Sequence, residues 1–135
     1  ALKFTKPEPF FEEHNQHIGL KVKKRLDRDI LANRLKRILG APPVLLKGGP
    51  SVCKKVGIVT GGAGSSITKA AAEGVDTFIT GEGPHWTGAL AEELGINVFY
   101  GGHYATETFG VKSLAAHLSK KYRLSWNFVD HPTGL

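Results

Sequence analysis

The sequence predicts an α/β fold in which a mixed, largely parallel sheet is flanked by helices. Three short apolar runs, 56–59, 75–79 and 96–100, are typical of buried strands, and a helical pattern follows each of them. Strands that alternate with short helices indicate βαβ crossovers. Each of these strands ends in an unusual turn, and the carboxyl ends of parallel neighbours meet at one edge of a sheet. We therefore expect a ligand site at that edge.

Composition favours a single globular domain. The chain has 135 residues, of which 41% are hydrophobic and 22% charged, which is enough for a core of its own. The one cysteine, Cys53, excludes an internal disulfide and fits a cytoplasmic protein. Lys54 and Lys55 would lower the pKa of its thiol, but no nucleophile–base pair is visible, so a structural thiol is expected. No apolar run reaches the length of a membrane span, so no membrane partner is expected.

The amino-terminal segment, residues 1–18, is predicted to be a loop, because two prolines argue against a regular helix. His14 and His17 are three residues apart and lie near two glutamates, a spacing compatible with metal binding. The segment shows no helical periodicity, however, so solvated histidines are the preferred interpretation. A short strand is expected at 18–22.

A basic amphipathic helix is predicted next. Asp27 is a suitable N-cap, an apolar stripe runs from Ile30 to Leu39, and Gly40 ends the helix. A short strand at 44–46 follows.

Positive charge is concentrated around this helix. The net charge is +6, and the excess lies largely within seventeen residues that also hold two aspartates. A solvated face is the preferred explanation, and a face that meets nucleic acid or another polyanion is the alternative. No nucleic-acid-binding motif accompanies the cluster. The basic residues are Lys21, Lys23, Lys24, Arg25, Arg28, Arg34, Lys36 and Arg37.

Residues 51–135 carry the regular α/β alternation, and we expect them to form one compact unit with residues 1–50. Beyond the last helix, residues 124–129 alternate between apolar and polar side chains, which predicts a half-buried closing strand. The predicted helices are 67–73, 85–94 and a long one from the turn at 101–103 to about Tyr122.

The turn Gly101-Gly102-His103 is the central candidate site. His103 and Glu107 are four residues apart, so both side chains share one face if a helix begins near His103. An imidazole and a carboxylate on one face are half of a metal site. The alternatives are a locally packed histidine and a glutamate that complements the helix dipole.

The glycine-rich loop at 61–66 follows the first buried strand. It resembles a phosphate cradle in which Gly62, Gly64 and Ser65 face the substrate. It lacks both the lysine of a Walker loop and the third glycine of a dinucleotide fingerprint. A plain tight turn is the alternative.

Glu82 follows the second strand, in the turn Thr80-Gly81-Glu82. It is predicted to be a general base or a partner that orients a ligand, and a helix N-terminal acid is the alternative. His85 is a weaker candidate for a ligand or proton shuttle.

In their order and spacing, the motifs at 61–65, 72–82 and 102–107 resemble the Nif-three-like family, whose members are often labelled GTP cyclohydrolase I type 2 homologues. The resemblance is specific over residues 56–130, and the preceding segment is similar to the family's middle region. It implies an α/β fold, two metal ions in a cleft between two related halves, and toroidal hexamers. It also implies that His103 and Glu107 are metal ligands.

The chain departs from the family pattern in one respect. The family's first half carries a tandem-histidine motif and an aspartate that complete the metal pair, and this chain has no His-His pair. It therefore resembles the carboxyl-terminal half of such a protein, as a fragment, a split subunit or a truncated homologue. Two ligands from one helix hold a metal weakly unless Glu82, His85 or a partner chain completes the shell.

The resemblance implies a metal-dependent hydrolase that acts on a nucleotide-like or phosphoester substrate. Two divalent ions (zinc, iron, manganese or nickel) would acidify the attacking water, and Glu82 would orient a ligand or shuttle protons. The alternative is a toroidal scaffold with structural or regulatory metals, whose basic face meets nucleic acid or a protein. The expected partners are the missing amino-terminal half of the family fold, further copies of the chain and a polyanion.

Overall fold

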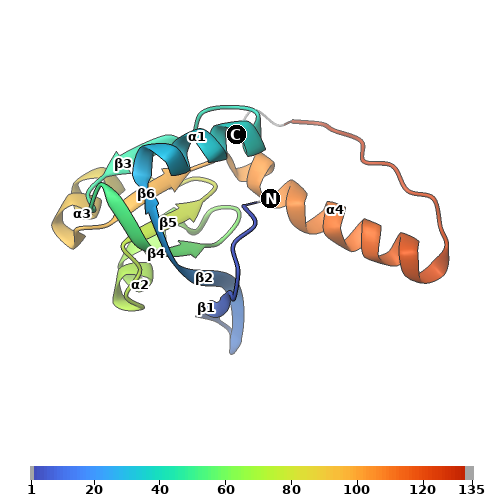
Figure 1. The fold of residues 1–135 in the computed structure, drawn as a ribbon, viewed down its shortest axis with the longest axis horizontal. Helices are drawn as coiled ribbons and strands as arrows, with labels where there is room; N and C mark the ends of the chain where they lie inside the picture. Colours follow the sequence, from blue (N-terminus) through green and yellow to red (C-terminus); the bar gives the residue numbers. More distant parts are fainter. Residues whose placement is uncertain (1, 133–135) are drawn as a thin grey trace.

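The computed structural model describes residues 2–132, which form a six-stranded sheet with helices packed on it (Figure 1). The strand order across the sheet is β1-β2-β4-β5-β6-β3. In chain order the elements are β1 (Glu8–Glu13), β2 (Gln16–Asp27), α1 (Arg28–Leu39), β3 (Val44–Lys47), β4 (Val52–Ile58), the 3₁₀ turn η1 (Ala63–Ser66), α2 (Ile67–Ala72), β5 (Thr77–Thr80), α3 (Thr87–Leu94), β6 (Asn97–Tyr100) and α4 (His103–Tyr122).

The sheet is mixed, as expected, but its parallel part is confined to β4, β5 and β6. The other pairings, β1 with β2, β2 with β4 and β3 with β6, are antiparallel. The prediction of a largely parallel sheet therefore holds only for the three strands that helices connect. Parallel neighbours need a crossover, which α2 and α3 supply, whereas the antiparallel hairpin needs only a short turn.

Most of residues 1–18 is not the predicted loop, because β1 and the start of β2 form a hairpin. His14 and Asn15 make its turn with positive φ values of 49° and 62°. Pro9 is tolerated because β1 is an edge strand, where a missing N–H costs no ladder bond. His14 and His17 are exposed, in agreement with the prediction.

Helix α1 begins and ends as its sequence predicts. The Asp27 carboxylate accepts hydrogen bonds from the backbone N–H groups of Asp29 and Ile30, at 2.8 and 3.1 Å. Gly40 ends the helix in the left-handed region, at φ 83°. The helix buries Leu31 and Leu35.

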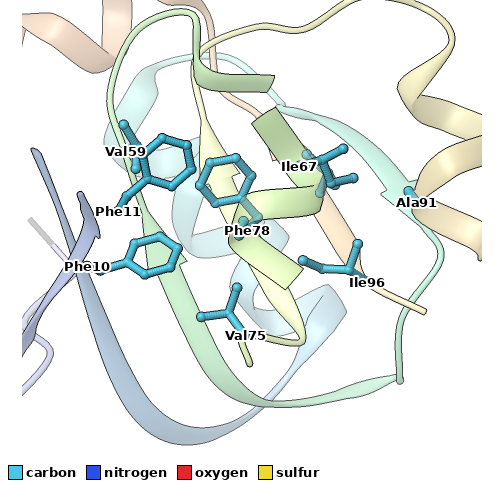
Figure 2. Packing of buried hydrophobic residues seen from close by; sticks show 10 residues of the cluster. Phe10, Phe11, Val59, Ile67, Val75, Phe78, Ala91 and Ile96 are labelled. Carbon is cyan, nitrogen blue, oxygen red and sulfur yellow. The ribbon is translucent and has the colours of Figure 1, made fainter. Parts of the chain in front are cut away.

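Buried side chains occupy both faces of the sheet, because neighbouring residues of a strand point in opposite directions. On the face that Figure 2 shows, the Phe11 and Phe78 rings stack with centroids 5.9 Å apart, and Phe10 meets Phe78 edge-on at 6.2 Å. Ile79 and Phe99 belong to the second cluster, which also contains the buried residues of α1.

Cys53 lies in this second cluster and is fully buried. Burial raises the pKa of its thiol, so the neighbouring lysines do not activate it. The prediction of a structural thiol is confirmed.

Helix α4 runs out from the sheet, and Thr106 is its one buried residue (Figure 1). The predicted closing strand at 124–129 is wrong, since this stretch has no regular structure and leaves Leu124, Trp126 and Val129 61%, 41% and 83% exposed. A strand needs a neighbour, and neither edge strand, β1 or β3, pairs with it. Within residues 2–132, neither α4 nor another helix has the length and apolar character needed to cross a bilayer.

We expect Phe78→Ala to lower the free energy of unfolding by about 3–5 kcal/mol, because the substitution removes the ring that both Phe10 and Phe11 contact. Urea unfolding followed by circular dichroism measures this change. Val129→Ala, at an exposed position, is the control and should change the value by less than about 0.5 kcal/mol. A loss below about 1 kcal/mol at Phe78 would contradict this packing.

Candidate metal centre

The turns after the three parallel strands meet at one edge of the sheet, as expected. The carbonyl oxygen of Gly61 accepts a hydrogen bond from the N–H of Gly81 at 2.7 Å. The N–H of Gly64 donates to the carbonyl of Glu82 at 3.0 Å, and that of Gly102 donates to Gly81 at 2.8 Å. Backbone hydrogen bonds therefore hold the three loops together without any contribution from the side chains of the site.

His103 lies at the start of α4 between two carboxylates. Its Nδ1 is 2.8 Å from Oε1 of Glu82, and its Nε2 is 3.3 Å from Oε1 of Glu107. Glu107 shares the helix face with His103, as the spacing of four predicts. Glu82 reaches the ring from the turn after β5. The three side chains are 39%, 50% and 57% exposed in the order His103, Glu82, Glu107, so the centre opens to solvent.

The two carboxylates raise the pKa of His103. The hydrogen bond that His103 donates to the Glu82 carboxylate is the largest cause of the rise. Partial desolvation of the ring opposes it, and the negative charges of Glu107 and Glu82 add to it. In the metal-free chain this arrangement therefore favours the imidazolium form.

Two buried threonines fix the backbone that faces this pair. The N–H of Gly61 donates to Oγ1 of Thr106 at 3.0 Å, and Oγ1 of Thr80 donates to the carbonyl of Gly61 at 3.0 Å. Gly61 has φ 75°, which favours glycine. A Cβ added there would stand 2.6 Å from Oε1 of Glu107 and 3.3 Å from Nε2 of His103. The missing side chain thus leaves space beside both donor atoms.

Gly61 and Thr106 are site residues that the sequence prediction did not single out. The motif at 61–66 includes Gly61. The local sequence does not show that Gly61, rather than Gly62 or Gly64, is the glycine that lies against the His103 and Glu107 donor atoms. Thr106 lies three residues after His103, yet its partner is 45 residues away along the chain. Only the packing of the loops against α4 reveals either role.

The loop at 61–66 is better described as a tight turn than as a phosphate cradle. The N–H groups of Gly61, Ala63 and Gly64 already donate to Thr106, Thr80 and Glu82. Amides bonded within the protein are not available to an anion, so the cradle interpretation loses most of its donors.

The three residues predicted to face a substrate, Gly62, Gly64 and Ser65, have different environments in the structure. Gly64 is buried, and a Cβ there would be 2.6 Å from Cα of Gly83, so the residue permits the close approach of two loops. Gly62 and Ser65 are exposed and line a hollow of about 340 Å³ beside His103 and Glu107. The remaining walls of this hollow are Phe11, Glu13, Ile18, Val59, Thr60, Ala63 and Ser66.

A second hollow, of about 400 Å³, adjoins Glu82 and Gly102. Its lining includes apolar side chains from β3 and from the turn after β5, together with His85 and Tyr100. The hydroxyl of Tyr100 is 2.6 Å from Oγ1 of Thr87, and burial raises the pKa of Tyr100. His85 is therefore placed at the wall of this hollow and not against the His103 ring.

The geometry of His103 and Glu107 fits two ligands of one metal ion. Bond lengths of about 2.0–2.2 Å to a tetrahedral ion place a nitrogen and an oxygen ligand about 3.3 Å apart, which is the separation observed. Glu82 contacts Nδ1 and so leaves Nε2 as the ring nitrogen that could bind an ion, an arrangement that carboxylates commonly give metal-binding histidines. In the part of the chain that the structure describes, no group of three His, Cys, Asp or Glu side chains is placed to hold an ion.

Comparison with known sequences adds a family context. The sequence profile described as Duf34/NIF3 (NGG1p interacting factor 3) matches residues 1–133. A protein named GTP cyclohydrolase 1 type 2 homolog from Deinococcus radiodurans is 35% identical over 137 residues, which cover all of this chain and 52% of that protein. Its namesake from Pyrococcus horikoshii is 36% identical over 99% of this chain and 54% of that protein. The chain spans about half the length of the curated relatives it matches.

Solved structures show the same relation. The protein ybgI, described as of unknown function, matches with a TM-score of 0.84 and 31% identity over 95% of this chain and 51% of that one. TTHA1606 from Thermus thermophilus matches with a TM-score of 0.78 and 40% identity over 85% of this chain and 46% of that one. The fold described above is therefore shared with about half of each of these structures.

We expect His103 to titrate above the ordinary histidine pKa in the metal-free chain, and Glu82→Gln to lower that pKa because it removes the largest cause of the rise. A pKa raised by folding stabilises the fold below the ordinary value, and this contribution is lost as the pH rises through the raised pKa. Proton NMR of the His103 ring measures the titration. Glu93→Gln, at an exposed position of α3, is the control, and an unchanged titration in Glu82→Gln would contradict the contact.

Proposed function

The chain belongs to the Duf34/NIF3 family, and from that premise we propose that it supplies one half of a metal-dependent hydrolase site. The observation that carries the proposal is the line Glu82–His103–Glu107, with separations of 2.8 and 3.3 Å. A carboxylate on one ring nitrogen and a second carboxylate beside the other is the arrangement of an oriented metal ligand.

His103 Nε2 and the Glu107 carboxylate would hold the ion. Histidine with carboxylate suits zinc, iron, manganese or nickel, and the resemblance to the family adds a second ion to the first. A divalent ion, when bound, supplies a Lewis acid that polarises a phosphoryl or carbonyl oxygen and acidifies water. Gly61 leaves the space in which the first ion would lie, because a side chain there would contact both donors.

Glu82 is a positioning residue in this proposal. It accepts the Nδ1 proton of His103, which fixes the ring orientation and makes Nε2 a stronger ligand. Half of its side chain is exposed, so its second carboxylate oxygen can take up or release a proton next to the centre.

The two hollows support a nucleotide-like or phosphoester substrate. The hollow beside His103 carries hydroxyl groups of Ser65 and Ser66, which suit phosphate oxygens. The hollow beside Glu82 contains Val44, Leu46 and the ring of Tyr100, which suit an organic group. The relatives named GTP cyclohydrolase 1 type 2 homologs point to the same substrate class.

The rest of the metal shell would come from outside the described residues. The relatives are about twice as long as this chain, so the half that they have in addition is the proposed source of further ligands. Assembly into hexamers and a cytoplasmic location are parts of the same proposal. The single, buried cysteine supports a reducing compartment.

The alternative function is a scaffold that binds a polyanion, and the distribution of basic side chains gives it some support. Lys24, Arg34 and Arg37 line a hollow of about 420 Å³ together with Lys3. Two members of the predicted basic face bond within the chain instead. Arg28 donates to the carbonyl of Gly49 at 3.2 Å and to Oδ1 of Asn97 at 3.1 Å, and Nζ of Lys21 pairs with Glu73 at 3.2 Å. The basic face that remains free is therefore smaller than the sequence suggests.

We expect the purified chain to bind a divalent ion with a dissociation constant weaker than about 50 nM. Complete structural zinc sites reach about 10–16 kcal/mol, and this chain supplies only two ligands. Isothermal titration with zinc and with manganese, checked by elemental analysis, measures the affinity. His103→Ala and Glu107→Gln should abolish binding, and Glu82→Gln should weaken it about 10–100-fold.

Glu92→Gln is the matched control, because it removes one exposed carboxylate from α3 without touching the centre. If both His103→Ala and Glu107→Gln still bind metal as the unmodified chain does, the proposed ligand pair is wrong.

The two functions predict different effects of a metal chelator. The hydrolase is assayed with this chain joined to the part of the Deinococcus radiodurans relative that it does not match, because the chain supplies only half of the site. We expect EDTA to abolish phosphate release from a nucleoside triphosphate or p-nitrophenyl phosphate by that protein, and added metal to restore it. For the scaffold we expect binding to a DNA duplex that EDTA leaves intact, that falls steeply with salt and that Arg34→Ala with Arg37→Ala weakens. DNA binding with no EDTA-sensitive turnover would reject the hydrolase in favour of the scaffold.

A further inference from the structure

A hollow beside α1 is lined by positive charge and shares no residue with the two hollows next to the candidate metal centre. Its volume is about 420 Å³, which is within the range of sites for small molecules. Its cations are Lys3 from the amino-terminal segment, Lys24 from β2, and Arg34 and Arg37 from α1. The described residues that line it include no aspartate or glutamate. We call it the basic hollow.

The charges of the basic hollow are not neutralised by ion pairs within residues 2–132. The three ion pairs that the structure shows there include none of the four cations. Arg34 and Arg37 are three residues apart on one helix face, where like charges repel. Arg37 donates its Nε to the carbonyl of Asn33 at 3.4 Å, so its Nη groups are the part that would meet a ligand. Holding four cations around one hollow costs free energy that a bound anion would offset.

The stability of α1 accounts for only part of this cluster. A cation in the last turn of a helix interacts favourably with the partial negative charge there, and Arg37 is in that turn. Lys3 and Lys24 belong to other segments of the chain. Lys24 lies where the pairing of β2 with β4 shifts its register, an irregularity that redirects side chains. Three separate segments therefore bring cations to the same hollow.

The remaining wall of the basic hollow is apolar. It consists of Leu2, Phe4 and Ile38, which are half-buried. Leu2 and Phe4 also pack against the second core cluster, so the core holds the amino-terminal segment in place beside α1. A ligand in this hollow would meet both cationic and apolar groups. The lining therefore suits a molecule in which an anionic group is joined to an aromatic or aliphatic one.

We propose that the basic hollow binds a small organic phosphate. A guanidinium group presents parallel N–H donors that match two phosphate oxygens, so Arg34 and Arg37 suit the phosphate. The apolar wall, with the ring of Phe4, would contact the organic part. A single-stranded nucleic acid is the competing ligand, but it needs a charged groove that follows its backbone beyond one hollow. The proposal concerns a site outside the metal centre and does not rest on the hydrolase.

The test titrates the isotope-labelled chain with naphthyl phosphate in the presence of EDTA and follows the backbone amides by NMR. All the residues that line the hollow belong to this chain. We expect saturable shifts of the amide signals at 2–4, 24 and 34–38. Naphthol and inorganic phosphate each lack one of the two recognised groups, so each should bind about tenfold more weakly.

Substitutions on two elements test the assignment. Arg34→Ala and Lys24→Gln should each weaken binding of naphthyl phosphate about tenfold, and Arg34→Lys should retain part of the affinity because it keeps the charge but not the paired donors. Lys36→Ala is the matched control, because it removes an exposed cation of α1 that does not line the hollow. The amide spectrum of each variant shows whether it is folded. Unchanged affinity in folded Arg34→Ala or in folded Lys24→Gln would overturn the proposal.

The location of the shifts separates this proposal from the metal proposal. His103→Ala should leave binding of naphthyl phosphate unchanged, whereas it should abolish metal binding. Shifts confined to residues 60–66 and 103–107, or no saturable shifts at all, would overturn the basic hollow as a phosphate site.

Two further results would also reject the small-molecule site. One is a single-stranded oligonucleotide that displaces naphthyl phosphate and that Lys36→Ala and Arg34→Ala weaken equally, which indicates an extended nucleic-acid face. The other is loss of the shifts when the chain is joined to the part of the Deinococcus radiodurans relative that it does not match, because the hollow would then be covered.

Discussion

The backbone of Gly61 is the junction on which the candidate centre depends. Its N–H and carbonyl groups bond to Thr106, Thr80 and Gly81, which belong to α4 and to the end of β5. Leaving a buried polar group of this kind without its partner costs about 1–3 kcal/mol, so the three loops cannot separate freely. The positions of Glu82 and His103 follow from this packing, because the junction holds both the loop of Glu82 and the start of α4, where His103 lies.

The centre is ordered on one side and open on the other. Glu82 and Glu107 fix both ring nitrogens of His103, whereas all three side chains are more than a third exposed. In the proposed function, this open edge is where ligands from outside the described residues would complete the shell of an ion. Exposed apolar residues of α4, among them Leu114 and Leu118, lie on the side of the helix that carries Glu107.

Local signals were sufficient for the elements that depend on local interactions. Asp27 and Gly40 mark α1 because capping and a left-handed end are properties of a few adjacent residues. The β1–β2 hairpin and the tail at 124–129 depend instead on contacts between distant parts of the chain. β1 forms because Phe10 and Phe11 are buried against Phe78, more than sixty residues away, and residues 124–129 stay irregular because no strand edge meets them. Alternation predicts what a strand would bury and not whether a neighbour is present.

For the site, the sequence by itself determined the pairing of His103 with Glu107, since a helical repeat of 3.6 residues places positions four apart on one face. It also determined that three turns share one sheet edge, because parallel strands end together. Only the tertiary structure decided that Glu82 binds Nδ1, that Gly61 faces the donors and that the loop amides are already used. Those contacts join residues 17 to 46 positions apart, and their geometry follows from how the loops pack against α4.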